Sequence, residues 1–204
     1  MLNESVRKAI NDQVTKEWYS AYLYLDFANY FDDEGLDGFA NWYKVQAKEE
    51  ASHAELIMNY LLDNDEKVKL GAIDAPTGEY KDHKTVLQAA LEHERFITAS
   101  INDIYAIAYK INDFRSMEFL NWFIKEQGEE EKNASDLIKK YELYGGNSDG
   151  LYSMNHRSVR VSTSPSVTPI TFIIGPEAGT ASCSTVGGVT RATQIGRASC
   201  RERV

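Results

Sequence analysis

The sequence is poor in cysteine, in long apolar runs and in clustered positive charge. Cys183 and Cys200 are its only cysteines, and their separation matches no metal-binding spacing, so a disulfide framework and a cysteine-based metal site are excluded. No stretch approaches the roughly eighteen consecutive apolar residues of a membrane-spanning helix, which leaves no membrane role. The net charge of −9 provides no basic face for phosphate groups, so no nucleic-acid partner is expected.

The amino-terminal residues also lack a targeting signal. Met1 to Ser5 do not show the basic and then apolar pattern of a signal peptide, so we expect a cytoplasmic location. A length of 204 residues is enough to bury a substantial core and suggests one domain or a little more.

The composition changes near residue 155. Residues 1–155 contain 16 basic and 29 acidic side chains, whereas residues 156–204 contain 6 and 2 and no lysine. The last ten residues, Ile195 to Val204, look like the translation of a common short-read sequencing adapter, residue by residue. We interpret the chain from about residue 156 as a frameshift or assembly chimera. Residues 155–204 are therefore predicted to form a disordered or artefactual tail without function.

Apolar residues that recur every three or four positions predict four long helices in the remaining chain. Their expected ranges are 4–32, 36–64, 83–111 and 113–144. Between the second and third lies a polar crossover, about 65–82, whose Gly71, Pro76 and Gly78 do not suit a helix. Because short turns join the other pairs, the pattern predicts an all-α fold, a four-helix bundle with one long crossover.

One acidic residue interrupts the apolar stripe near the middle of each helix, and two helices carry a second ligand-type side chain three residues away. These residues are Glu17, Glu94, the pair Glu50 and His53, and the pair Gln127 and Glu130. Singly, each glutamate is explained as well by a snorkelling side chain, and a lone buried histidine is more often hydrogen-bonded than metal-bound. Together they predict a metal site, because an unpaired buried carboxylate costs several kcal/mol.

Residues 1–154 resemble bacterial non-haem ferritins. The resembling stretches are Glu17-Trp18-Tyr19-Ser20, Ala47-Lys48-Glu49-Glu50, Glu126 to Lys132 and Gly150-Leu151-Tyr152. The ferritin-like di-iron pattern has one glutamate on each of two helices and Glu-x-x-His on the other two. Here Gln127-Gly128-Glu129-Glu130 replaces the second Glu-x-x-His, as is typical of ferritin proper. The resemblance implies a ferritin-like di-iron domain over residues 1–154 and a non-family tail over residues 155–204.

The resemblance also implies the ligands and the reaction. Glu17, Glu50 and His53 would hold one iron, with Glu50 bridging, and Glu94, Glu130 and Gln127 would hold the second. These oxygen-rich ligand sets suit iron. The implied function is iron storage with ferroxidase activity, in which dioxygen or hydrogen peroxide oxidises Fe(II) and the product is stored as a ferric oxide-hydroxide mineral.

Five further residues are assigned by the resemblance. Tyr24, two turns after Glu17, would lie beside the di-iron centre as a hydrogen-bond partner or one-electron donor, although core packing explains it as well. Trp122 is either a second donor or a buried aromatic residue. Glu49, Glu126 and Glu129 would form a third iron site at the inner edge of the bundle, the alternative being ordinary solvated charges.

Related classes are excluded by single features. Bacterioferritins bind haem through a methionine directly after the second-helix ligand glutamate; Ala51 holds that position, so no haem is expected. Miniferritins that protect DNA place their iron ligands at a subunit interface instead of inside the bundle. Rubrerythrin-like peroxidases carry a Cys-x-x-Cys domain and a second Glu-x-x-His, which are both absent. A purely structural bundle leaves the convergence of ligand types unexplained.

Family members assemble as hollow 24-subunit shells, with a short fifth helix near the four-fold axes. The resemblance ends at about Met154, and Pro165 and Pro169 prevent the following segment from replacing that helix. We therefore expect the fifth helix to be missing and the assembly of the homo-oligomer into a closed shell to be impaired. The predicted iron ligands all precede the break.

Overall fold

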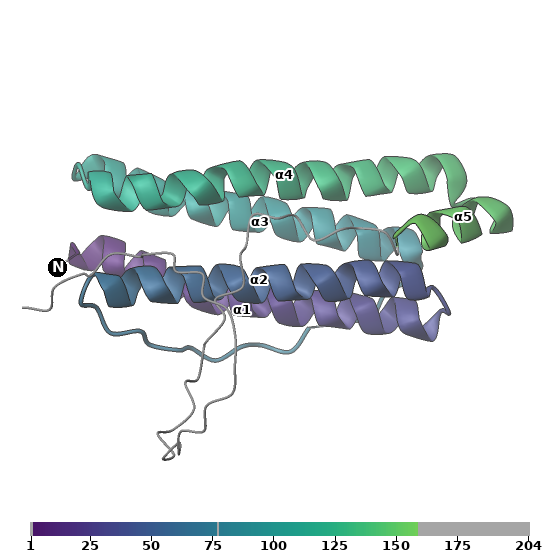
Figure 1. The fold of residues 1–204 in the computed structure, drawn as a ribbon, viewed down its shortest axis with the longest axis horizontal. Coiled ribbons are helices and arrows are strands. Elements are labelled where there is room, and N and C mark those ends of the chain that lie inside the picture. The colour runs from purple at the N-terminus through teal and green to yellow at the C-terminus, as the bar shows by residue number, and fades with distance from the viewer. Residues whose placement is uncertain (1, 77, 159–204) are drawn as a thin grey trace, which may run out of the picture. The chain divides into compact units, whose positions relative to one another are not determined.

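The computed structural model describes residues 2–76 and 78–158, and these residues form five α-helices and no strand. The helices are α1 (Glu4–Asp33), α2 (Asp37–Asp63), α3 (His83–Lys110), α4 (Phe114–Tyr144) and α5 (Ser148–Ser158). Helices α1 to α4 lie side by side as a bundle, and α5 lies at one end of it (Figure 1). None of the helices in these residues is long and apolar enough to span a membrane.

The predicted all-α bundle with one long crossover is confirmed, and the helix ends agree with the predicted ranges to within one or two residues. Asn3, Asp82 and Asp113 cap α1, α3 and α4 by accepting hydrogen bonds from backbone N–H groups of the first turn. The crossover is held along α1: the Asn11 side chain pairs with the backbone of Lys69, and the Tyr80 hydroxyl donates to Asp26 at 2.8 Å.

The prediction that the fifth helix is missing is wrong, because α5 covers Ser148–Ser158. Gly145 and Gly146 end α4, but Asn147 then starts a new helix by accepting a hydrogen bond from the backbone N–H of Gly150 at 2.7 Å. The predicted domain boundary at residue 155 falls inside α5 and otherwise stays a prediction. The predicted disorder of the tail lies outside the described residues from residue 159 onward.

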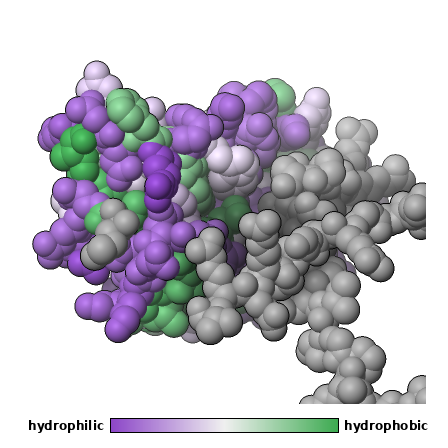
Figure 2. Space-filling view, turned by 60° about the vertical axis from the view of Figure 1, so that its left-hand side comes forward, coloured by the Kyte–Doolittle hydropathy of each residue, from purple (hydrophilic) through white to green (hydrophobic). Residues whose placement is uncertain are grey.

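The buried apolar side chains form two clusters along the bundle. The first consists of Leu23, Tyr24, Phe27, Ala28, Phe31, Leu36, Phe39, Ala40, Tyr43, Ala47, Val86, Leu87, Ala90 and Met154. The second consists of Val6, Ile10, Val14, Ile57, Leu61, Ile97, Ile101, Ile104, Ala108, Leu120 and Phe123. Along α1, α2 and α3, the predicted metal ligands fall in the sequence interval between the two clusters. The outside of the bundle is mostly hydrophilic on the face shown in Figure 2.

Candidate metal centre

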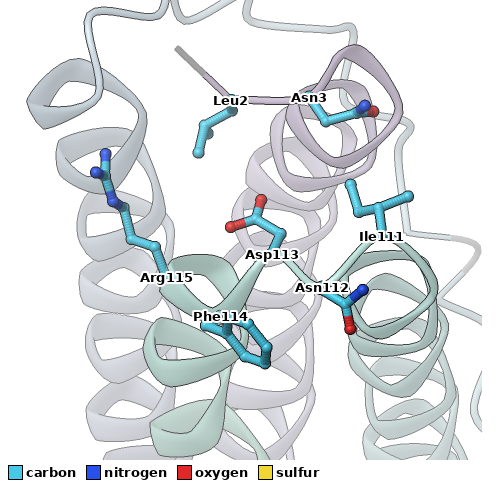
Figure 3. Close-up of a pocket in the computed structure, with 7 residues that line it drawn as sticks. All are labelled: Leu2, Asn3, Ile111, Asn112, Asp113, Phe114 and Arg115. Atoms are coloured by element: carbon cyan, nitrogen blue, oxygen red, sulfur yellow. The ribbon is translucent and has the colours of Figure 1, made fainter.

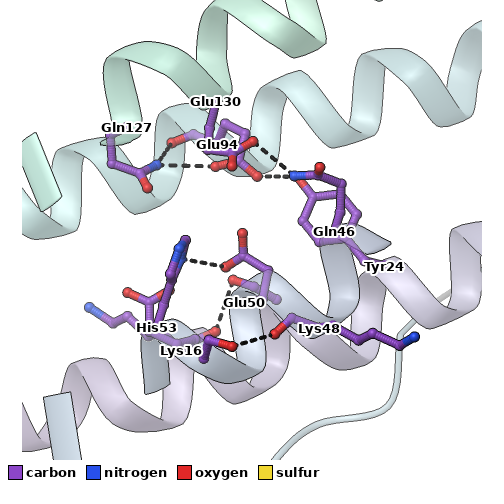
Figure 4. A network of polar contacts seen from close by, with 12 residues as sticks. Lys16, Tyr24, Gln46, Lys48, Glu50, His53, Glu94, Gln127 and Glu130 are labelled. Carbon is purple, nitrogen blue, oxygen red and sulfur yellow. Dashed lines mark hydrogen bonds and ion pairs between the residues drawn. The ribbon is translucent and has the colours of Figure 1, made fainter. Parts of the chain in front are cut away.

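All six predicted ligands are buried inside the bundle, with between 1% and 5% of their surface exposed. They are Glu17, Glu50, His53, Glu94, Gln127 and Glu130. Each of the four long helices contributes at least one of them. Figure 4 shows the side chains of Glu50 and His53 facing those of Glu94, Gln127 and Glu130 across the centre of the bundle. The structure therefore brings together the residues that interrupt the four apolar stripes.

Glu17, Glu50 and His53 form the tightest group. One ligand atom from each lies within 4.8 Å of the others, and within residues 2–76 and 78–158 no other such group is found. Three buried atoms of these side chains have no hydrogen-bond partner: Glu17 Oε2, Glu50 Oε1 and His53 Nδ1. Buried polar atoms normally have partners. His53 Nδ1 lies 3.7 Å from Glu50 Oε2, which is too long for a hydrogen bond. Two carboxylates and one imidazole with atoms that lack hydrogen-bond partners are a donor set that fits a cation such as iron.

The remaining predicted ligands already have protein partners. Gln127 Nε2 donates to Glu94 Oε2 at 3.1 Å and to the Glu94 backbone oxygen at 3.3 Å. The Tyr24 hydroxyl donates to Glu94 Oε1, and Gln46 Nε2 donates to Glu130 Oε2 at 3.0 Å. We call the six predicted ligands the buried layer. Its half with Glu94, Gln127 and Glu130 is hydrogen-bonded without a cation, whereas its half with Glu17, Glu50 and His53 has atoms without a hydrogen-bond partner.

Burial makes the carboxylates hold protons. Burial, together with the neighbouring Glu50 carboxylate, raises the pKa of Glu17 to about 8. Burial and the nearby Glu94 carboxylate raise the pKa of Glu50 well above its ordinary value, and burial also raises the pKa of Glu94. The pKa of Glu130 rises to about 9, mainly because of burial and then because of Glu94. A bound cation would replace these protons as the compensating positive charge.

Two aromatic side chains flank the layer. Tyr24 is buried and stacks on Tyr43, with 5.7 Å between ring centroids, and its hydroxyl contacts Glu94 as described above. Burial, followed by the Glu94 charge, raises the pKa of Tyr24, so the phenol stays protonated. The half-buried ring of Trp122 lies 5.3 Å from the ring of His53. The electron-donor roles of Tyr24 and Trp122 stay predictions.

The predicted third iron site is less well formed. Glu49 and Glu126 are half-buried and Glu129 is exposed. Burial raises the pKa of Glu49 and of Glu126, and each of these two pKa values is also raised by a neighbouring glutamate. Among the residues that the structure describes, no ligand group contains these three side chains. The third site stays a prediction.

Several buried polar residues around the layer were not predicted from the sequence. They are Gln13, Ser20, Gln46, His93 and Ser100. Gln13 Nε2 donates to Glu17 Oε1 at 2.8 Å, and the Ser20 hydroxyl lies 2.7 Å from His93 Nε2. Gln13 and Gln46 each precede a predicted ligand by four residues, the spacing that places two side chains on one helix face. A search for polar residues at that spacing would have found both.

A surface pocket of about 450 Å³ lies away from this layer, at the end of the bundle where α3 meets α4 (Figure 3). Its lining residues are Leu2, Asn3, Ile111, Asn112, Asp113, Phe114 and Arg115. It shares no residue with the buried polar layer, so the candidate site is the layer inside the bundle.

The fold and the layer define a helical bundle protein whose core contains a group of side chains of the metal-ligand type, and comparison with known proteins identifies the family. The model of the ferritin-like domain matches residues 7–144. A protein of Haemophilus influenzae described as a "probable bacterial non-heme ferritin-like protein" is 36% identical over 163 residues, which are 80% of this chain and 99% of that protein. The bacterial non-heme ferritin of Campylobacter jejuni is 35% identical over 152 residues, covering 74% of this chain and 91% of that protein.

Solved ferritin structures are also similar to this chain. A closed form of the Archaeoglobus fulgidus ferritin, engineered by site-directed mutagenesis, superimposes with a TM-score of 0.78 at 34% identity and covers 80% of this chain and 100% of that chain. The open-pore ferritin of the same archaeon gives a TM-score of 0.77 at 35% identity, covering 79% and 98%. The chain belongs to the ferritin family. The predicted resemblance to bacterial non-haem ferritins is confirmed.

Proposed function

We propose that this protein is an iron-storage protein with ferroxidase activity, whose catalytic centre is the buried layer of Glu17, Glu50, His53, Glu94, Gln127 and Glu130. The single observation that carries this proposal is the group of three buried ligand atoms on Glu17, Glu50 and His53 that have no hydrogen-bond partner. Membership of the ferritin family supports iron as the cation.

In the proposed reaction, two Fe(II) ions bind in one layer and each loses one electron. Dioxygen takes up the two electrons and two protons and becomes hydrogen peroxide; alternatively, hydrogen peroxide takes up two electrons and two protons and becomes two waters. When iron binds, Glu17, Glu50 and Glu130 would release their protons to the solvent, because burial raises the pKa of each above its ordinary value. The ferric product then leaves the layer and is deposited as a ferric oxide-hydroxide mineral.

We expect the two iron positions to differ in affinity. The Glu17, Glu50 and His53 position offers atoms without partners, whereas a cation at the second position must displace hydrogen bonds that Tyr24 and Gln127 make to Glu94. The neutral Gln127 also supplies less charge than a carboxylate would. This weaker position is suited to releasing oxidised iron, as storage requires.

The remaining assignments follow from the family. We propose two irons per subunit, a third at Glu49, Glu126 and Glu129, no haem, a cytoplasmic location and a homo-oligomeric shell of the 24-subunit type. The archaeal relatives whose structures match are described as open-pore and closed-form ferritins, which supports a hollow assembly.

Aerobic oxidation of Fe(II) by the purified protein tests the function. We expect rapid appearance of Fe(III) absorbance for about two irons per chain, and loss of that rapid phase in Glu50→Ala. Glu55→Ala is the matched control, because Glu55 is an exposed glutamate on the same helix. A wild-type rate no higher than that of free iron in the same buffer would refute ferroxidase activity.

A further inference from the structure

A line of hydrogen bonds leads from the surface of the bundle to the carboxylate of Glu17. Lys16 Nζ donates to Ser100 Oγ at 2.5 Å, and Ser100 Oγ donates to Gln13 Oε1 at 2.6 Å. Gln13 Nε2 completes the line by donating to Glu17 Oε1 at 2.8 Å. Gln13 has no exposed surface and Ser100 is buried, whereas Lys16 is half-buried beside Phe96 on the outside. The line crosses from α1 to α3 and back.

The direction of every hydrogen bond in this line follows from the ammonium group. An ammonium nitrogen donates and has no lone pair to accept with, so the Ser100 hydroxyl accepts from Lys16 and donates its own proton onward. The Gln13 atom facing Ser100 must then be the carbonyl oxygen, which turns the amide NH₂ group toward Glu17. The Glu17 carboxylate, which accepts hydrogen bonds, favours the same orientation, and the contact of Ser100 and Lys16 with the amide oxygen reinforces it.

The two carboxylate oxygens of Glu17 have different surroundings. Oε1 accepts the hydrogen bond from Gln13, while Oε2 has no partner and lies in the group with Glu50 and His53. A carboxylate held through one oxygen has little freedom to rotate. Hydrogen bonds in a chain also polarise one another, so the positive charge of Lys16 strengthens the bond that reaches Glu17.

We propose that Gln13, Ser100 and Lys16 are positioning residues that hold Glu17 so that its Oε2 is presented to the first metal ion. The proposal rests on the proposed function for the identity of that metal as iron. The expected effect on the affinity of the Glu17, Glu50 and His53 position does not depend on iron and also holds for other divalent cations. Outer hydrogen-bond partners of metal ligands commonly change metal affinity by about ten- to a hundredfold.

The other half of the layer provides a matched comparison. Gln46 Nε2 donates to Glu130 Oε2 at 3.0 Å, so each half has one buried glutamine bonded to one carboxylate. Removal of Gln46 therefore creates a similar defect in the bundle, but not at Glu17. A difference between variants of Gln13 and Gln46 separates an effect on Glu17 from a general loss of packing.

Co(II) titration under anaerobic conditions tests the proposal without any oxidation, since Co(II) gives a visible spectrum that depends on its ligands. We expect Gln13→Leu to raise the Kd of the first Co(II) about tenfold and to change its spectrum, because it removes a hydrogen bond to a charged group. Gln13→Asn, which is polar but one methylene shorter, should show the same loss. Gln46→Leu should leave the first Kd within about twofold of wild type.

Variants of Ser100 and Lys16 test the rest of the line. Ser100→Ala and Lys16→Met should each raise the first Kd about threefold, because they weaken the contact that holds the amide oxygen of Gln13 while the Gln13 bond to Glu17 remains. Ser100→Thr keeps the hydroxyl and should restore the wild-type value. If Gln13→Leu fails to fold by circular dichroism, the Ser100→Ala and Ser100→Thr pair decides the question.

The outcomes distinguish this proposal from the proposed function. A folded Gln13→Leu protein with wild-type Co(II) affinity and spectrum would overturn the positioning role, as would equal losses in Ser100→Ala and Ser100→Thr. If the wild type binds Co(II) with the expected variant effects but does not oxidise Fe(II), the positioning role stands and the ferroxidase proposal fails. Absence of Co(II) binding at this position in the wild type would overturn the positioning role, and the Fe(II) oxidation rate would decide the ferroxidase proposal by itself.

Discussion

At the residue scale, the buried layer consists of carboxylates whose ionisation is opposed by their surroundings. Burial raises the pKa of Glu17 to about 8 and that of Glu130 to about 9, from an ordinary value of 4.5. Near neutral pH both groups hold protons when no cation is present. Metal binding is therefore expected to release protons, and its apparent affinity should increase as the pH rises.

We predict that the metal-free protein becomes less stable as the pH rises from about 5 to about 9. In the unfolded chain Glu17 and Glu130 ionise near pH 4.5, whereas in the folded protein they keep their protons up to about pH 8 and 9. The folded state thus binds more protons in this window, so the free energy of unfolding must fall with rising pH. Chemical denaturation of chelator-treated protein at several pH values measures this dependence.

Glu17→Gln is the control for that prediction, because an amide cannot ionise and the slope should become shallower. Saturating Co(II) should also remove most of the slope, since the cation replaces the protons. A stability that is constant or rises between pH 5 and pH 9 in the metal-free wild type would contradict the raised pKa values.

The metal ligands and their hydrogen-bond partners differ in how well the sequence predicts them. Glu17, Glu50 and Glu94 interrupt apolar stripes, and a buried charge has few explanations other than a cation or a paired charge. Gln13 and Gln46 carry no charge, and a neutral amide on a stripe is compatible with many environments. Glu17, the partner of Gln13, lies four residues later on the same helix, so helical spacing could suggest that contact. The contacts of Gln46 with Glu130 and of Gln13 with Ser100 join different helices, and local sequence does not contain that information.

At the scale of helices, α2 depends on α5 for its amino-terminal cap. The N-cap residue of α2, Leu36, makes no side-chain hydrogen bond to the helix. Instead Asn155 Oδ1 accepts from the backbone N–H groups of Gly38 at 2.7 Å and Phe39 at 3.2 Å. A Cβ atom on Gly38 would lie 1.7 Å from the Asn155 backbone oxygen, so this close approach requires glycine. Helix α5 is thus anchored to α2.

We predict that Asn155→Ala lowers the free energy of unfolding of the metal-free protein by about 1 kcal/mol, the usual cost of losing a side-chain cap. Asn155→Asp should retain the stability, because a carboxylate accepts the same hydrogen bonds and favours a helix amino terminus. Urea denaturation followed by circular dichroism measures both variants. Equal stability of Asn155→Ala and wild type would show that α5 does not cap α2.

The long helices were predictable and α5 was not. Each long helix has an apolar stripe of several turns, which is the strongest local signal for a helix. Helix α5 spans only 11 residues, and Gly145 and Gly146 suggested that the helical part of the chain ended there. Its anchoring contact joins Asn155 and Phe39, which are 116 residues apart in the sequence. A pattern search within one segment does not detect such a pair.

At the scale of the whole molecule, the surface of the single subunit includes large apolar side chains. Tyr22, Leu25, Leu70 and Ile73 are exposed on α1 and on the crossover that lies along it. Exposed apolar patches often mark contacts with other chains. Burial of these side chains between subunits would accompany the proposed assembly from many copies of this chain.

We predict that the purified protein forms a particle many times larger than its 23.1 kDa chain. Leu25→Lys should reduce the particle size, because it places a charge at an exposed apolar position of α1 that the proposed assembly would bury. Light scattering coupled to size-exclusion chromatography measures the mass of both proteins, with exposed Lys8→Ala as a control on the same helix. A monomeric wild type would contradict the shell, although a monomer could still oxidise iron.

The most direct test of the di-iron centre is anomalous diffraction at the iron edge from crystals soaked anaerobically in Fe(II). The layer should show two iron peaks inside each bundle, the stronger one bound by Glu17, Glu50 and His53 and the weaker one by Glu94 and Glu130. The bridging carboxylate between them should be Glu50. Iron found only on the surface, with none between the four helices, would contradict the assignment of the buried layer as the metal centre.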